Sequence, residues 1–222
     1  MKLGVLVSGR GSNLEAILSA VATGALSRIE PVIVISNRPG VRAIRVADEH
    51  GVPSRVLPRS AFDDLDERDA AIGAALTAAG VQLAVLAGYD QRLREGYFTA
   101  FRGRTINIHP SLLPRHGGRG MMGLAVHEAV LAAGDRETGV TIHEVTPELD
   151  AGPALRQIRV PVHATDTPSR LADRVLAVEH RALVGLLREL SEPPLAEGTD
   201  QESSASMTGA PAKRTASGAE AR

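Results

Sequence analysis

The sequence contains no cysteine and no long apolar run. Without cysteine the chain has no disulfides, no thiolate metal ligands and no cysteine nucleophile, which is compatible with a reducing compartment. No apolar run approaches the roughly 20 residues that a transmembrane helix needs. The apolar residues 3–7 are also too few for the core of a secretory signal peptide. We therefore expect a cytoplasmic protein that does not contact a membrane.

The sequence also lacks an excess of charge of either sign. It has 25 basic and 26 acidic side chains and a formal charge of -1, so no global field attracts nucleic acid or an anionic membrane. The 222 residues, of which 43% are hydrophobic, are enough for one substantial core and favour one domain or a domain with a tail. Partners must therefore be argued from local sites, and the sequence assigns no oligomeric state.

Strand and helix signals alternate from the amino terminus. Apolar runs such as residues 3–7 and 81–87 are typical of strands buried on both faces, and glycines often follow the periodic helical segments. We predict strands at residues 3–7, 31–36, 52–57, 81–87, 105–109, 139–145 and 155–162, and helices at residues 13–23, 41–50, 63–79, 95–101, 124–133 and from 168 onwards. This order predicts an α/β fold with a mostly parallel central sheet flanked by helices.

The composition changes at about residue 191. From there to residue 222 the chain is dominated by Pro, Ser, Thr, Ala, Gly and Glu, and its large apolar residues are Leu195 and Met207. Such a segment buries too little apolar surface to offset the entropy lost on ordering. We therefore predict a folded domain over residues 1–190 and a disordered, low-complexity tail over residues 191–222.

A glycine-rich loop of sequence Ser-Gly-Arg-Gly-Ser-Asn-Leu joins the first predicted strand to the first predicted helix. Gly9 and Gly11 allow a tight turn, and free N–H groups at a helix amino terminus attract anions. The alternative is a plain strand-to-helix turn, and two glycines alone favour neither interpretation. Leu14 replaces the third glycine of a dinucleotide fingerprint, whereas Ser12 and Asn13 add side-chain donors. These details favour a site for a terminal monophosphate.

Two polar side chains lie at the end of the predicted strand near the middle of the chain. Asn107 and His109 alternate with apolar residues, so both side chains point to the same side of the strand. Pro110 has no N–H for the sheet ladder and therefore ends the strand. We interpret this pair as the chemical centre of the protein.

Two residues further along the chain can act with His109. His143 lies on another predicted strand, and Asp150 lies in the turn after that strand. A carboxylate close to an imidazole stabilises the protonated ring. The alternative is a core histidine and a turn aspartate that do not meet.

The sequence offers no convincing activated nucleophile. Ser111 follows a proline instead of lying in a Gly-x-Ser-x-Gly elbow, and no lysine stands in an apolar strand. If the protein is an enzyme, the attacking group therefore belongs to the substrate. Asn107 and His109 would then stabilise negative charge on a carbonyl oxygen. Asp150 would support the protonated imidazole and accept protons, and this arrangement is typical of direct acyl transfer.

The other histidines and one glutamate give weaker signals. The histidine spacing fits no metal site, and we predict no bound metal. We expect His50 to end a surface helix, His127 to be solvated on an amphipathic helix and His163 to flank the end of a strand. His180 should face solvent, because it lies opposite the apolar stripe of its helix. Glu179 lies at the edge of that stripe and can reach the sheet, although spacing alone favours a solvated carboxylate.

Four motifs occur in order: residues 8–14 (SGRGSNL), 86–89 (LAGY), 107–114 (NIHPSLLP) and 148–153 (ELDAGP). They resemble the motifs of the phosphoribosylglycinamide formyltransferases, the folate-dependent enzymes of purine synthesis in the formyl transferase superfamily. The resemblance runs from about Lys2 to Leu190. It implies a Rossmann-like formyltransferase fold and transfer of a formyl group from 10-formyltetrahydrofolate to the amine of glycinamide ribonucleotide.

The resemblance also implies a role for each matching residue. Asn107 and His109 polarise the formyl oxygen, His109 donates a proton, and Asp150 stabilises the protonated form of His109, with His143 in support. The residues implied for the ribonucleotide are Gly11, Ser12 and Asn13 at the phosphate and Glu179 at the ribose. The residues implied for the reduced folate are Tyr89, Asp90, Gln91, Arg92, Leu93 and Asn107. The folate is a cosubstrate, and no tightly bound cofactor is expected.

The chain departs from the family in the folate segment. Asp90 and Gln91 stand where an apolar and a basic residue are usual. Asp90 therefore places a negative charge beside an anionic cosubstrate, unless Arg92 offsets that charge.

Three further departures concern positive charge near the phosphate. Leu65 stands where some members have an arginine, with Arg68 about one turn later, and Leu176 replaces a residue that is often polar or basic. The loop at residues 117–123 is longer than in some members. Arg119 in this loop can supply the missing positive charge.

Other interpretations remain in the same superfamily and outside it. Methionyl-tRNA formyltransferase, formyltetrahydrofolate deformylase and the sugar-nucleotide N-formyltransferases share the Asn-x-His and Asp arrangement, but the phosphate loop disfavours all three. The first would need an RNA-binding domain and the second a regulatory domain before the first strand, and we expect neither here. A different class is a nucleotide-binding or regulatory module that keeps the fold but has lost folate binding through Asp90 and Gln91.

Overall fold

Apolar side chains alternate along the first strand, β1 (Lys2–Val7), and supply both faces of a central sheet. Leu3 and Val5 point into one core, and Leu6 points into the other. The computed structural model describes residues 1–192, so the predicted tail lies outside the described residues from position 193 onwards. The other strands are β2 (Glu30–Ser36), β3 (Ser54–Val56), β4 (Leu83–Leu86), β5 (Arg104–His109), β6 (Glu137–Glu144) and β7 (Ala154–Pro161).

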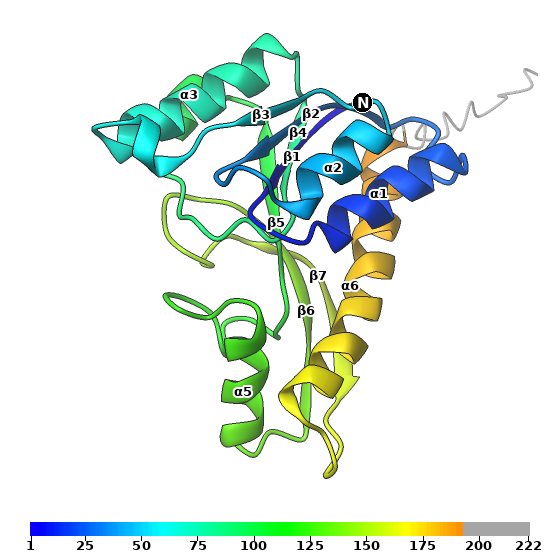
Figure 1. Cartoon of the computed structure of the whole chain (residues 1–222). Coiled ribbons are helices and arrows are strands. Elements are labelled where there is room, and N and C mark those ends of the chain that lie inside the picture. Colours follow the sequence, from blue (N-terminus) through cyan, green and yellow to red (C-terminus); the bar gives the residue numbers. More distant parts are fainter. Residues whose placement is uncertain (193–222) are drawn as a thin grey trace, which may run out of the picture. The chain divides into compact units, whose positions relative to one another are not determined.

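Helices cover both faces of the sheet within residues 1–192 (Figure 1). The helices are α1 (Ser12–Ala22), α2 (Arg42–Glu49), α3 (Leu65–Ala78), α4 (Glu95–Ala100), α5 (Leu124–Ala132) and α6 (Pro168–Ser191), with a short 3-10 turn at Arg59–Ala61. Helices α1, α2, α5 and α6 contribute to the core on one face, whereas α3 and α4 pack on the opposite face. The two cores hold the sheet edge that carries the polar residues in a fixed position.

The sheet has the strand order β3-β2-β1-β4-β5-β6-β7. The first five strands in this order are parallel, and β6 and β7 run antiparallel to their neighbours. The predicted α/β fold with a mostly parallel sheet is therefore confirmed. Because the chain moves from β1 to β2 on one side and returns to β4 on the other, a crevice forms at the carboxyl ends of β1 and β4.

The predicted strands and helices are all present, and some strands are shorter than predicted. β3 begins at Ser54 instead of residue 52, because the Val52 N–H bonds to the carbonyl of Ala47 at the end of α2. β4 begins at Leu83 for a similar reason, since the Val81 N–H bonds to the carbonyl of Leu76 in α3. In both cases the end of a helix uses the backbone donor that a longer strand would need.

Helix α6 begins as the sequence predicts. The Thr167 hydroxyl accepts a hydrogen bond of 3.3 Å from the Arg170 N–H, and Pro168 occupies the first turn. The helix packs on β6 and β7 and reaches α1 (Figure 1). In the part of the chain that the structure describes, no helix is long and apolar enough to cross a membrane.

Candidate functional site

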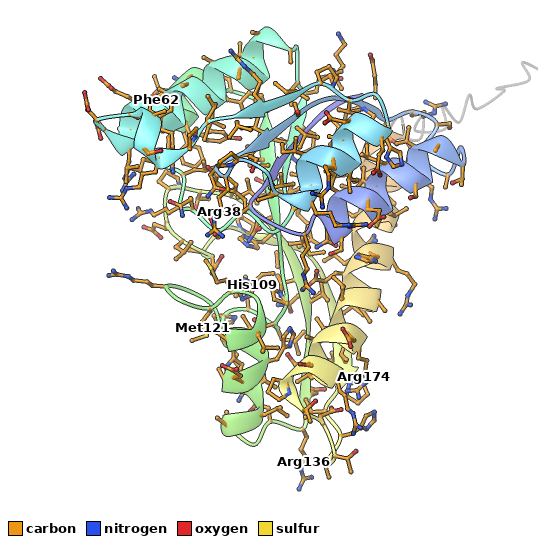
Figure 2. All side chains as sticks on the ribbon, viewed as in Figure 1. Arg38, Phe62, His109, Met121, Arg136 and Arg174 are labelled. Carbon is orange, nitrogen blue, oxygen red and sulfur yellow. The ribbon has the colours of Figure 1, made fainter. Side chains whose placement is uncertain are left out.

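One large cleft opens at the carboxyl ends of β1, β4 and β5. Its volume is about 550 Å³, and its walls include the glycine loop, the segment after β4, the end of β5 and the loop after β6. Arg38, His109 and Met121 lie around this cleft (Figure 2). All thirteen residues that the sequence implicates line it: Gly11, Ser12, Asn13, Tyr89, Asp90, Gln91, Arg92, Leu93, Asn107, His109, His143, Asp150 and Glu179.

The glycine loop presents the amino terminus of α1 to the cleft. Gly11 precedes the helix with a φ of 74°, and a Cβ atom at this position would lie 2.7 Å from the Cβ of Ala43. Glycine therefore satisfies both the left-handed backbone and the close contact with α2. No side chain caps this end of the helix, so the first backbone N–H groups can bind an anion.

Asn13 and Glu179 meet at the floor of the cleft. Both side chains are only 7% exposed, and the Asn13 amide nitrogen donates a hydrogen bond of 2.8 Å to Glu179 Oε2. Burial raises the pKa of Glu179, while the hydrogen bond from Asn13 acts against this rise. Spacing alone favoured a solvated carboxylate for Glu179, and this expectation is wrong. The last helix carries this residue inward because its neighbours pack on α1.

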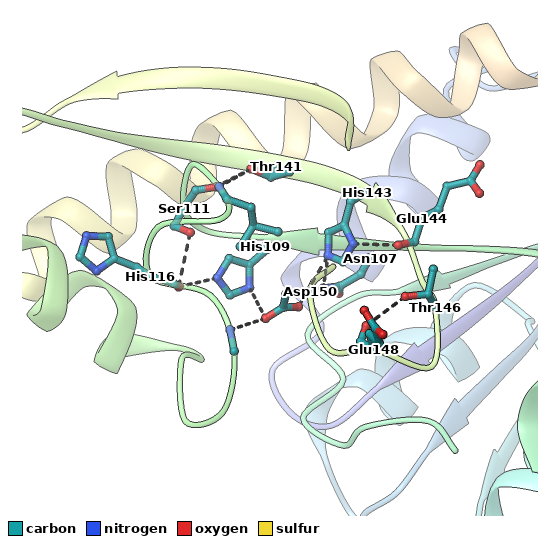
Figure 3. A network of polar contacts seen from close by, with 12 residues as sticks. Asn107, His109, Ser111, His116, Thr141, His143, Glu144, Thr146, Glu148 and Asp150 are labelled. Carbon is teal, nitrogen blue, oxygen red and sulfur yellow. Dashed lines mark hydrogen bonds and ion pairs between the residues drawn. The ribbon is translucent and has the colours of Figure 1, made fainter. Parts of the chain in front are cut away.

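Asn107 lies directly opposite His143 in the antiparallel pair of β5 and β6. The Asn107 amide nitrogen is 3.1 Å from His143 Nε2, and His143 Nδ1 is 2.9 Å from the carbonyl oxygen of Glu144 (Figure 3). Because a carbonyl only accepts, His143 carries its proton on Nδ1, and Nε2 accepts from Asn107. Burial lowers the pKa of His143, which favours this neutral form. The second amide hydrogen of Asn107 is therefore left for a group in the cleft.

His109 lies between a carboxylate and a backbone carbonyl. Its Nδ1 is 3.9 Å from Asp150 Oδ2, and its Nε2 is 2.9 Å from the carbonyl oxygen of His116 (Figure 3). Asp150 Oδ2 also accepts a hydrogen bond of 2.8 Å from the Gly118 N–H, and Oδ1 is 3.7 Å from His143 Nε2. The structure thus brings His109, His143 and Asp150 together, as the sequence interpretation required.

The backbone of Asp150 is unusual. Its φ is 54°, in the left-handed region that favours glycine. Asp150 lies in the loop after β6, next to the half-exposed Leu149 and two residues before Gly152. This conformation turns the carboxylate toward the two histidines.

The segment after β4 forms a second wall of the cleft. Tyr89 and Leu93 are buried in the core beneath α3 and α4, and they fix the segment. Arg92 donates hydrogen bonds of 2.6 and 3.0 Å to the carbonyl of Pro147. Arg92 therefore bonds to this carbonyl, and the alternative in which it offsets Asp90 is not realised in the described residues.

Asp90 has other partners. Asn37 donates a hydrogen bond of 2.7 Å to its carboxylate, and Arg38 pairs with the second carboxylate oxygen. Burial acts to raise the pKa of Asp90, but these partners and a hydrogen bond from Gln91 hold it below the ordinary value. The Asp90 N–H also bonds to the Ser8 hydroxyl at 2.9 Å. The segment after β4 is thereby joined to the glycine loop.

The basic residues that the sequence suggests for the phosphate do not lie together in the structure. Arg68 is buried, contacts Asp69 and lies 3.3 Å from the Gln91 side-chain oxygen, and it does not line the cleft. Arg119 lines the cleft and is exposed, and Leu176 also lines it. Arg10 in the glycine loop is a further exposed cation at this end. The positive charge available to an anion thus comes from exposed side chains on loops.

Two histidines lie in places that sequence reasoning missed. His127 is 4% exposed and lines the cleft, and its Nδ1 has no hydrogen-bond partner. Burial lowers its pKa. His180 is half-buried instead of facing solvent, and burial lowers its pKa as well. One sequence feature could have indicated that His127 lies at the cleft: it is one turn into a helix that follows a glycine-rich loop. Within residues 1–192 no three His, Cys, Asp or Glu side chains are arranged so that they could hold a metal ion.

Comparisons with known proteins agree with this geometry. Residues 1–187 match the family model described as formyl transferase. The chain is 36% identical over 180 residues to the phosphoribosylglycinamide formyltransferase of Escherichia coli, which covers 81% of this chain and 82% of that protein. It is 39% identical over 188 residues, 85% of this chain, to the trifunctional purine biosynthetic protein adenosine-3 of Gallus gallus. The chain spans 18% of the length of that larger protein.

A solved structure is similar over the same region. Glycinamide ribonucleotide transformylase 1 from Symbiobacterium toebii superposes with a TM-score of 0.80 at 37% sequence identity, covering 86% of this chain and 87% of that one. The residues matched by the family model, 1–187, include every residue that lines the cleft, because these residues all fall within 8–179. The chain therefore belongs to the formyl transferase family.

Proposed function

We propose that the protein transfers a formyl group from 10-formyltetrahydrofolate to the amine of 5'-phosphoribosylglycinamide, a step of de novo purine synthesis in the cytoplasm. The observation that carries this proposal is the meeting of Asn107, His109 and Asp150 in one cleft, beside an uncapped helix amino terminus. The names of the bacterial relative and of the similar solved structure support formyl transfer to the same ribonucleotide. The reduced folate is a cosubstrate that leaves after each turnover.

The reaction is a direct transfer between the two substrates. The glycinamide nitrogen forms a bond to the formyl carbon, the bond from that carbon to N10 of the folate breaks, the amine loses one proton, and N10 gains one. Negative charge develops on the formyl oxygen in the transition state. The free amide hydrogen of Asn107 and the Nδ1–H of protonated His109 stabilise this charge.

Asp150 has two tasks in this proposal. Its carboxylate, 3.9 Å from His109 Nδ1, orients the imidazole ring and attracts its positive charge when Nδ1 carries a proton. The same carboxylate can accept the proton that the attacking amine releases, directly or through one water molecule. The Gly118 N–H holds the carboxylate in place from the other side. His143 contributes by orienting Asn107 and not by titrating, because it is held neutral.

The two substrates bind to different walls of the cleft. The ribonucleotide phosphate binds at Gly11, Ser12 and Asn13, where backbone N–H groups are free. The Glu179 carboxylate accepts a hydrogen bond from a ribose hydroxyl. The folate lies along the segment 89–93, where backbone groups form hydrogen bonds with the donors and acceptors of its pterin ring. Asp90 does not prevent this binding, since Arg38 already balances the charge of its carboxylate and Asn37 donates a hydrogen bond to it.

A direct assay tests the proposal. Folded protein is mixed with 10-formyltetrahydrofolate and glycinamide ribonucleotide, and release of tetrahydrofolate is followed. Turnover that requires both substrates is expected. Absence of turnover would refute the proposed reaction, and saturable binding of the ribonucleotide without binding of a reduced folate would instead favour the nucleotide-binding module.

A further inference from the structure

The ring of His109 is fixed by a hydrogen bond on the side opposite Asp150. Nε2 lies 2.9 Å from the backbone carbonyl oxygen of His116, and this oxygen can only accept. Nε2 must therefore carry a proton in both charge states of the ring. The second nitrogen, Nδ1, then becomes the one that gains and loses a proton beside Asp150. The position of one carbonyl thus decides which nitrogen does the chemistry.

That carbonyl belongs to a turn whose backbone needs external support. His116 has a φ of 53°, in the left-handed region that non-glycine residues seldom adopt. The Ser111 hydroxyl donates to the carbonyl of Arg115 at 2.6 Å. The same hydroxyl lies 3.4 Å from the carbonyl of His116 (Figure 3). Both contacts join residues that are close in sequence, and both use backbone carbonyls. The His116 side chain is therefore free to bind elsewhere.

The His116 side chain binds Asp135, in the turn between α5 and β6. Its Nε2 lies 2.7 Å from Asp135 Oδ2, and the Arg115 guanidinium pairs with Oδ1. The Asp135 side chain is only 8% exposed. The hydrogen bond from His116 holds the pKa of Asp135 below its ordinary value. One carboxylate therefore anchors two consecutive residues of the turn.

We propose that Asp135 is a positioning residue: through His116 it holds the carbonyl that keeps His109 in the Nε2–H tautomer and directs Nδ1 toward the formyl group. Asp135 does not line the cleft, so it acts only through the turn. The inference rests on the proposed function for its effect on catalysis. Its effect on the tautomer does not depend on any substrate.

The first measurement uses the protein without substrates. The imidazole nitrogen signals of His109 are recorded by NMR on protein labelled with ¹⁵N-histidine, in alkaline buffer where the ring is neutral. The wild-type protein should show the Nε2–H tautomer. Asp135→Ala should add a population of the Nδ1–H tautomer, whereas Asp135→Asn, which keeps an oxygen for His116, should retain the wild-type pattern. An unchanged tautomer in Asp135→Ala would overturn the proposal.

The second measurement is the rate of formyl transfer. Asp135→Ala should lower kcat by about tenfold or more, because misplacing a catalytic group slows the chemical step, and both KM values should stay within about twofold. Asp135→Asn should restore kcat. A normal kcat in Asp135→Ala, or a change confined to KM, would overturn the inference. If wild-type protein shows no turnover, the proposed function fails, and the NMR result alone decides the inference.

A matched variant separates positioning from stability. Asp166 pairs with Arg174 through both carboxylate oxygens, its side chain is 2% exposed, and neither residue lines the cleft. Asp166→Ala should lower the melting temperature without changing kcat or the tautomer, and equal losses in both alanine variants would refute a positioning role. If Asp135→Ala does not fold, His116→Ala removes the same anchor and leaves the positive φ without that support. It should give the same tautomer change.

Discussion

The side-chain amide of Asn13 donates a hydrogen bond of 2.8 Å to the carboxylate of Glu179, joining α1 to α6 across 166 positions of sequence. Both side chains are buried at the floor of the cleft. The bond places a donor and an acceptor side by side below the uncapped end of α1. A phosphorylated sugar needs this combination, since the phosphate takes donors and the ribose hydroxyls offer them.

Asn13→Ala should raise KM for the ribonucleotide by about tenfold, the effect of losing one hydrogen bond to a charged group. KM for the folate should change little, because the Asn13 side chain bonds to Glu179 and to no residue of the segment 89–93. Steady-state kinetics with each substrate varied in turn measures both constants. Glu15→Gln, on the exposed surface of the same helix, is the control. A larger change for the folate would reassign the loop.

Asn107→Ala and His109→Ala should each lower kcat by about 10²-fold, the scale of one lost oxyanion donor. Thr105 lies on the same strand and bonds to the buried Tyr97 hydroxyl at 2.7 Å, so Thr105→Val should reduce stability but leave kcat near normal. Single-turnover rates on variants of confirmed fold make the comparison. A near-normal kcat in either cleft variant contradicts the assigned role.

Arg38→Ala should raise KM for the folate, because the Asp90 carboxylate then faces an anionic cosubstrate without its cation. The increase should shrink at high salt, since Arg38 is more than half exposed. Adding Asp90→Asn to Arg38→Ala should restore the wild-type KM, and the double-mutant cycle gives the coupling. If the two changes simply add, Arg38 does not act by neutralising Asp90.

The free energy of unfolding should decrease as the pH falls below about 6.5, because burial lowers the pKa values of His127, His143 and His180 in the folded protein. Below the ordinary value the unfolded chain binds more protons than the folded chain, so acid favours unfolding. Denaturant titrations at about pH 7.5 and about pH 5.5 measure the loss. The carboxylates with lowered pKa values, such as Asp166, act only at more acidic pH.

His127→Phe should make this loss smaller, because it removes one of the three histidines. His50→Gln, at an exposed helix end, is the matched control and should behave as the wild type. The raised pKa of Glu179 opposes the trend, as its contribution is lost with rising pH, but it is common to all three proteins. Equal losses in His127→Phe and the wild type would contradict the prediction.

A chain that ends at residue 192 should keep its activity. The family match ends at residue 187, and the residues that line the cleft end at Glu179. The test compares kcat and both KM values of the shortened and the full-length protein at equal concentration. A large decrease in kcat would show that the segment 193–222 contributes to the reaction.

Local patterns were sufficient to predict the strands, the helices and the pair Asn107 and His109. The period of two along β5 places both side chains on one face, and the same pattern puts Ile106 and Ile108 in the core. The proline after His109 marked the end of the strand. Such features depend on neighbouring residues, and the sequence displays them directly.

Features that depend on distant contacts were not predictable in the same way. The helical period places Glu179 only at the edge of an apolar stripe, and nothing local indicates that Asn13 will meet it. The burial of His127 depends on how α5 packs, and the partners of Asp90 come from the loop after β2. The motifs identified which residues matter, but the pairings required the fold.

The left-handed backbone of Asp150 sets two goals of protein engineering against each other. A glycine there would adopt the φ of 54° with less strain, so a selection for thermal resistance alone would reward the replacement. The same replacement would remove the carboxylate that His109 and His143 share. Selection for thermal stability would therefore favour an inactive variant at position 150. A mutant library that is designed for stable folding must keep aspartate at this position if its members are to remain active.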